Sequence, residues 1–150
     1  MKSLTACIAG LALAATLAGC ERRKEVPPPA PMTADTSAIA FQKIDTVVGT
    51  GKEAKVGDRV TVHYTGWMYM PDAPQRHGAE FDSSLKRMPF TFRIGGATVI
   101  KGWDEGVAGM KVGGKRTLVV PGAMAYGKDG VGPIPANANL IFDIQLVEVL

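Results

Sequence analysis

The feature that most constrains the fold is a repeated alternation of apolar and polar residues in short runs between residues 41 and 150. In one such run, Val60, Val62 and Tyr64 fall on the same face of an extended chain. A period of two predicts half-buried β-strands rather than helices. We expect strands at residues 58–66, 89–95, 115–122 and 139–150, and a further one at 44–48.

One segment has a helical period instead. Within residues 101–110, Trp103, Val107 and Met110 are spaced at i, i+4 and i+7 and share a face. Glycine-rich turn signals separate the other runs. The pattern therefore predicts an α+β fold, in which an antiparallel sheet of about five strands packs on one short helix.

The first 20 residues, MKSLTACIAGLALAATLAGC, do not belong to this pattern. Their apolar run is shorter than the roughly 20 residues that span a bilayer, so residues 1–19 are interpreted as a secretory signal peptide. The end of the run resembles the lipobox of bacterial lipoproteins, in which the cysteine after the cut, here Cys20, is acylated. A cysteine buried in a hydrophobic helix is the alternative. The lipoprotein interpretation predicts a palmitate-type anchor in the bacterial cell envelope, at the outer membrane facing the periplasm.

Residues 20–40 carry the acylated cysteine and four prolines but little apolar bulk. We expect an extended tether of the polyproline type, with the folded domain at 41–150. A proline-rich ligand for a partner is the alternative.

Charge and cysteine content exclude several classes of function. The chain has 17 Lys and Arg against 14 Asp and Glu, without a cluster of basic and aromatic residues, so we expect no nucleic-acid partner. Of its two cysteines, Cys7 lies in the predicted signal peptide. If Cys20 is acylated, the mature domain has no thiol for a nucleophile, a metal site or a disulfide.

Two glycine motifs imitate nucleotide-binding loops. The segment 109–115 resembles a phosphate loop, but Arg116 stands where magnesium binding requires a hydroxyl, and a strand follows. The segment 49–54 resembles a dinucleotide fingerprint, yet Gly57 and Asp58 leave no room for the helix that would hold a pyrophosphate. Both are interpreted as turns.

Other candidate chemistry is equally weak. His63 and His77 have no cysteines or carboxylates at ligand spacing, and both are expected to be solvated. The paired serines Ser83 and Ser84 lack the glycines of a nucleophile elbow. Asp82 before them is as compatible with capping a turn as with a functional role. We predict no metal site and no cofactor.

The remaining candidates are aromatic side chains spread over several runs. Most aromatic residues in a small domain belong to its core. Trp103 and Tyr126 differ, because Trp103 follows a glycine at a helix start and Tyr126 lies in a glycine-flanked loop.

Six segments, taken in order, resemble the FKBP-type peptidyl-prolyl cis-trans isomerases over residues 41–150. They are VHYTGW, FDSS, PFTF, VIKGWDEGV, AYG and a last segment in which IP, AN and NLIFD follow one another before the last strand. The family fold is an antiparallel half-barrel round a short helix, in agreement with the pattern above.

The resemblance also implies a pocket. It assigns catalytic roles to Tyr64, Phe81, Asp82, Tyr126 and Phe142, and substrate binding to Phe90, Val99, Ile100, Trp103, Ile134 and Arg87. Trp103 would form the floor under a proline ring, and Phe92 would pack beneath the pocket. The match at Arg87 is one residue out of register, and residues 67–80 and 127–139 depart from the family pattern.

The implied activity is rotation about X-Pro bonds in folding envelope proteins, without covalent catalysis. Implied partners are proline-containing clients and macrolide inhibitors such as tacrolimus, and we expect a monomer. Two alternatives remain: a non-catalytic module that binds proline segments as a chaperone or adaptor, and a structural lipoprotein whose aromatics are core.

Overall fold

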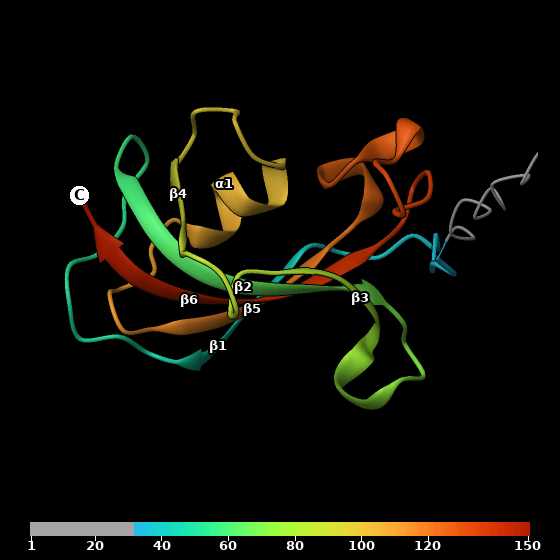
Figure 1. Cartoon of the computed structure of the whole chain (residues 1–150), viewed down its shortest axis with the longest axis horizontal. Coiled ribbons are helices and arrows are strands. Elements are labelled where there is room, and N and C mark those ends of the chain that lie inside the picture. The colour runs from blue at the N-terminus through green and yellow to red at the C-terminus, as the bar shows by residue number, and fades with distance from the viewer. Residues whose placement is uncertain (1–31) are drawn as a thin grey trace, which may run out of the picture.

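A computed structural model describes residues 32–150 as an antiparallel sheet that curves round one α-helix (Figure 1). The predicted signal peptide, Cys20 and the prolines at 27–31 lie outside the described residues. Within residues 32–150, no helix is both long enough and apolar enough to cross a membrane.

All strand pairs of the sheet are antiparallel. Its order is β1 (Gln42–Val47), β5 (Lys115–Val120), β6 (Leu140–Val149), β2 (Arg59–Tyr69) and β3 (His77–Ser83), while β4 (Phe90–Arg93) pairs with the first part of β2. The predicted α+β half-barrel is confirmed, as are the five expected strands. β3 is an additional strand, which the period of two does not indicate because none of its side chains is fully buried.

The alternating residues form the core on the concave face of the sheet. Val60, Val62 and Leu146 are completely buried, and Ile144 is 1% exposed. Removing such side chains from water supplies the main driving force for folding.

The helix α1 (Lys101–Val107) lies directly on this face. A Cβ atom at Gly102 would lie 2.5 Å from a methyl carbon of Val120, and one at Gly106 would lie 2.4 Å from a methyl carbon of Leu118. Only glycine permits so close an approach. As a result, the side chain of Trp103 packs directly against the sheet. The helix ends at Val107 rather than at the expected residue 110, although Met110 is still buried.

Three short 3-10 turns complete the described chain: η1 (Pro74–Arg76), η2 (Gly122–Met124) and η3 (Gly127–Asp129). Figure 1 shows η2 and η3 on the same side of the sheet as α1. Neither glycine-rich turn is followed by a helix, since β5 begins at Lys115 directly after one of them. The rejection of a phosphate loop therefore agrees with the fold.

The segment before β1 packs on the domain from residue 32 onward and is not a free tether there. Met32 and Ala34 pack against the core, and the backbone N–H of Asn139 donates to the carbonyl of Asp35 at 2.8 Å. The packed part of the chain thus starts before the predicted boundary at residue 41.

Candidate active site

A cavity of about 510 Å³ opens between the concave face of the sheet, α1 and the loop that carries Tyr126. Side chains from β2, β3, β4 and β6 meet there, although they are far apart in the sequence. It is lined by Tyr64, Phe81, Asp82, Phe90, Ala97, Thr98, Val99, Ile100, Lys101, Trp103, Ala125, Tyr126 and Phe142.

Trp103 forms the floor of this cavity. Its side chain is 5% exposed, and its ring meets Tyr64, Phe142 and Phe90 edge to face at centroid distances of 4.8, 5.4 and 6.0 Å. Such geometry brings a positive ring edge to a negative ring face and fixes the rings. The buried indole Nε1 has no hydrogen-bond partner among residues 32–150. Phe92 is buried against Trp103 and does not line the cavity, as expected.

Gly66 on β2 makes one wall possible. A Cβ atom there would lie 2.6 Å from Phe81 Cζ and 2.8 Å from Phe142 Cε1. Without it, the rings of Phe81 and Phe142 meet edge to face over the strand at 5.6 Å. The glycine in the VHYTGW segment therefore shapes the cavity.

Asp82 and Tyr64 form the polar side of the cavity. The Tyr64 hydroxyl donates to Asp82 Oδ2, and the other carboxylate oxygen pairs with the guanidinium of Arg87. Burial, and then the Asp82 carboxylate, raise the pKa of Tyr64 to about 12. Tyr64 therefore stays a protonated donor at physiological pH.

Two donors face the cavity with no partner. The backbone N–H of Ile100, just before α1, and the Tyr126 hydroxyl donate to no acceptor in the described chain. Burial, and then the charge of Asp82, raise the pKa of Tyr126, so this phenol also stays protonated. Unpaired donors beside apolar walls can bind carbonyl groups of a peptide.

Sequence reasoning found no role for two residues that support the site. Ser84 is 2% exposed, and its Oγ accepts the backbone N–H of Tyr64 at 2.9 Å. Asp104 accepts the N–H groups of Gly95 and Ala97 at 2.8 and 3.2 Å, and so fixes the loop that enters α1. The position of Asp104 next to Trp103 in the first helical turn is the one signal in the sequence.

The structure brings nine of the eleven predicted pocket residues into the cavity lining: Tyr64, Phe81, Asp82, Phe90, Val99, Ile100, Trp103, Tyr126 and Phe142. It does not bring in the other two. Ile134 is a core residue, 6% exposed, and Arg87 lies outside the lining and reaches it only through Asp82. The prediction that Ile134 contacts substrate is therefore not supported by its position in the structure.

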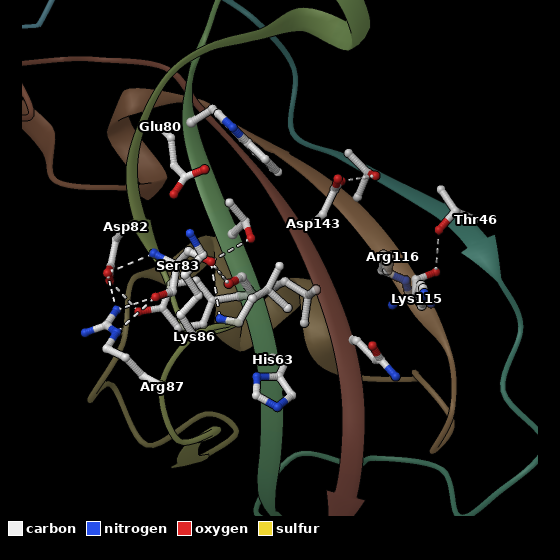
Figure 2. A pocket seen from close by; sticks show the side chains of 17 residues that line it. Thr46, His63, Glu80, Asp82, Ser83, Lys86, Arg87, Lys115, Arg116 and Asp143 are labelled. Atoms are coloured by element: carbon white, nitrogen blue, oxygen red, sulfur yellow. Dashed lines mark hydrogen bonds and ion pairs between the residues drawn. The ribbon is translucent and has the colours of Figure 1, made fainter.

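A second hollow, of about 700 Å³, lies on the outer face of the sheet (Figure 2). Asp82, Ser83 and Arg87 gather on one side of it, and Thr46, Lys115 and Arg116 on the other. Its lining is rich in polar groups that bond to one another, such as Thr117 Oγ1 to Asp143 Oδ1 at 2.6 Å. It lacks the cluster of phenylalanine side chains, with Trp103 and Tyr126, that lines the first cavity.

The histidines are not the solvated side chains that the sequence predicts. His63 is half-buried at this outer face, with Nδ1 3.1 Å from Ser84 Oγ. The ring of His77 stacks on Trp67 at a centroid distance of 3.9 Å and is only 17% exposed. In the part of the chain that the structure describes, no group of three or more metal-ligating side chains is arranged to hold an ion.

Comparison with known proteins identifies this architecture. Residues 50–147 match the family model of the FKBP-type peptidyl-prolyl cis-trans isomerases. An FK506-binding protein of Neisseria meningitidis serogroup B is 50% identical over 107 residues, which are 70% of this chain and 92% of that protein. The 39 kDa FK506-binding nuclear protein of Drosophila melanogaster is 51% identical over 107 residues, 71% of this chain and 28% of that protein.

Solved structures agree. The crystal structure of AtFKBP13 superposes with a TM-score of 0.64 at 40% identity, covering 73% of this chain and 93% of that one. The crystal structure of FkpA from Escherichia coli superposes with a TM-score of 0.64 at 40% identity, covering 77% of this chain and 51% of that one. The antiparallel half-barrel round one short helix is thus the fold that this chain shares with these solved structures. The chain belongs to the FKBP-type peptidyl-prolyl cis-trans isomerases, and rotation about peptidyl-prolyl bonds is its activity.

Proposed function

We propose that this isomerase acts on proline-containing polypeptides of a bacterial cell envelope, and that the aromatic cavity accelerates rotation by desolvating and orienting the X-Pro bond. The observation that carries the proposal is the pairing of aromatic walls with two donors that have no acceptor within residues 32–150, Ile100 N–H and the Tyr126 hydroxyl.

The chemistry requires no covalent intermediate. Rotation about an amide faces a barrier of about 20 kcal/mol, because its partial double bond must be broken. In the twisted transition state the carbonyl has lost resonance and carries less negative charge, so water stabilises it less than the planar amide. An apolar cavity therefore binds the twisted form preferentially. A thousandfold acceleration needs about 4 kcal/mol of this preference.

Each wall has a role in this mechanism. Trp103, Val99, Phe90 and Phe142 enclose the proline ring, and the two free donors hold substrate carbonyls and fix the peptide. The carboxylate of Asp82, bonded to Tyr64, presents a charge to the twisting carbonyl. Asp82 is not a general base, because no proton has to move.

An isomerisation assay of the full chain on a short X-Pro peptide tests the mechanism. We expect clear acceleration, and we expect a proline-ring analogue to inhibit it. The rate should not change between pH 6 and pH 9, because Tyr64 and Tyr126 remain protonated. Activity at the uncatalysed level would contradict the proposal. A bell-shaped pH profile would instead indicate acid–base chemistry.

The same cavity is proposed to bind FK506-type macrolides, the ligands for which the Neisseria and Drosophila relatives are named. A macrolide that fills the cavity should inhibit the isomerase competitively and raise its unfolding temperature. Inhibition without competition against the peptide would place the ligand elsewhere.

We also propose that acylated Cys20 anchors the chain to the outer membrane, facing the periplasm, and that the protein acts as a monomer. The lipobox-like end of the leader supports the anchor. A Cys20→Ala variant should appear in the soluble fraction, whereas the parent should sediment with outer-membrane markers. Unchanged sedimentation would count against lipidation. Light scattering of the Cys20→Ala chain should give the mass of one copy, and a dimer mass would contradict the monomer.

A further inference from the structure

Residues 35–37 are held to the domain by Asn139, whose backbone N–H donates to the carbonyl of Asp35 and whose side chain is buried at 2% exposure. The amide nitrogen of Asn139 donates to Asp35 Oδ1 at 3.0 Å and to the carbonyl of Ser37 at 2.8 Å. Ser37 N–H also donates to Asp35 Oδ1, at 2.7 Å, so the turn itself is fixed. The two bonds from the Asn139 amide join positions that are more than 100 residues apart.

The remaining polar atom of the same side chain points toward the active-site loop. Asn139 Oδ1 accepts the backbone N–H of Gly122 at 3.0 Å in a buried hydrogen bond. An asparagine amide has two donor hydrogens and one acceptor oxygen, and all of them find a partner here. Asp35 and Ser37 offer only acceptors, so they force the oxygen toward Gly122.

Gly122 begins the turn that leads to Tyr126. Ala125 N–H donates to the carbonyl of Gly122 at 3.1 Å, and a Cβ atom at Gly122 would lie 2.5 Å from the carbonyl oxygen of Asn137. On the other side of Tyr126, the carbonyl of Gly127 accepts the N–H of Asn137 at 2.7 Å. The loop of Tyr126 is therefore attached at both ends to residues 137–139.

From these contacts we infer that Asn139 is a positioning residue for Tyr126, and that residues 35–37 lock it in place. The segment that precedes the sheet is then part of the support of the active site rather than a passive link. The inference rests on the proposed role of the Tyr126 hydroxyl as a donor to substrate. Losing a buried hydrogen bond on one side of the amide leaves the partner unpaired and loosens what it holds.

A double-mutant cycle on the full chain tests the coupling. Asn139→Asp keeps the shape and the oxygen that faces Gly122, but it sets a carboxylate against Asp35 and Ser37. We expect it to lower kcat/KM about fivefold when Tyr126 is present and less than twofold in a Tyr126→Phe background. Equal losses in both backgrounds would overturn the inference. A parent without activity would overturn the proposed function instead.

A second variant avoids the buried residue, in case Asn139→Asp does not fold. Asp35→Ala removes one acceptor from outside the core, and hydrogen exchange reports the result directly. We expect exchange at the Gly122 amide to accelerate about fivefold, while the Leu118 amide in the middle of the sheet stays unchanged. Thr36→Ala is the matched control, because its exposed side chain makes no hydrogen bond within residues 32–150. No change at Gly122, or an equal change at Leu118, would overturn the inference.

Discussion

The two faces of the sheet carry two hollows of opposite character. The outer hollow is the larger, at about 700 Å³ against about 510 Å³, yet the isomerase site lies in the smaller one. In the outer hollow, several polar groups bond to their neighbours, as Arg87 does to Asp82 and Thr117 does to Asp143. In the inner cavity, aromatic walls surround donors that have no partner in the described chain. What a site can bind depends on its unpaired hydrogen-bonding groups and on its aromatic lining more than on its volume.

The largest expected effect is on the inner face, at Phe142. Phe142→Ala removes a ring that is 2% exposed and that contacts both Trp103 and Phe81. It should lower the free energy of unfolding by about 3–5 kcal/mol. It should also lower kcat/KM on the order of a hundredfold.

Denaturant titration and the peptide assay measure these two changes. Phe142→Leu, which keeps most of the volume, should lose less stability, and exposed Val48→Ala should change neither quantity. If Phe142→Ala kept the kcat/KM of the parent, the claim that the inner face holds the substrate site would be wrong.

A smaller effect is expected at Tyr126. Tyr126→Phe removes only the hydroxyl, so the free energy of unfolding should stay constant while substrate loses one hydrogen bond of about 1 kcal/mol. This corresponds to a decrease in kcat/KM of about fivefold. Steady-state kinetics with an X-Pro peptide measure it, and Tyr69→Phe is the control outside the cavity lining. If both variants behave alike, Tyr126 is not a donor to substrate.

Arg116 and Asp45 lie on the α1 side of the sheet but outside the cavity lining, and a variant there should change stability and leave activity alone. Arg116 is 8% exposed, and its Nε donates to Asp45 Oδ1 at 2.6 Å. Asp45→Asn leaves the buried guanidinium without its counter-charge and should cost about 2 kcal/mol of unfolding free energy. We expect kcat/KM to stay within twofold of the parent, and Asp72→Asn, in an exposed turn, to change neither. A large loss of activity in a fully folded chain would show that the Asp45–Arg116 pair, which also bonds the last carbonyls of α1, positions the site.

The pH dependence of Asp45 sharpens this prediction. The hydrogen bond from Arg116 holds the pKa of Asp45 below its usual range. A lowered carboxyl pKa contributes stability above the unfolded value, and the contribution is lost as the pH falls through the folded value. The stability difference between parent and Asp45→Asn should therefore shrink in acid. A difference that is constant from pH 7 to pH 3 would argue against the ion pair.

The smallest effect is expected at alkaline pH. The pKa of Tyr64 is raised from 10 to about 12, so folding favours its neutral form. This contribution to stability is complete below pH 10 and is lost as the pH rises through about 12. Denaturation at pH 8.5 and 11 should show a larger loss in the parent than in Tyr64→Phe. Identical losses would mean that Tyr64 titrates normally.

The sequence predicted the alternating core and the cavity better than the long-range polar pairs. The period of two placed Val60, Val62 and Leu146 in the core, and recognisable segments brought eight aromatic and apolar positions, together with Asp82, to one cavity. Both predictions depend on residues that lie close together in the sequence. The pairs Asp45–Arg116 and Asp35–Asn139 join residues 71 and 104 positions apart, and their formation depends on strand register. β3 was missed because none of its side chains is fully buried, and the burial of Ile134 was missed because it depends on contacts with the rest of the core.

The two tryptophans of the chain give the most direct test of the central claim, because Trp103 lines the inner cavity and Trp67 lines the outer hollow. In a nitrogen–proton correlation spectrum, each indole N–H gives its own signal, and Trp67→Phe assigns them. When an X-Pro peptide is titrated into the full chain, we predict that the Trp103 signal shifts in a saturable way and that the Trp67 signal does not move. A saturable shift of Trp67 with Trp103 unchanged would contradict the account and place the substrate on the outer face.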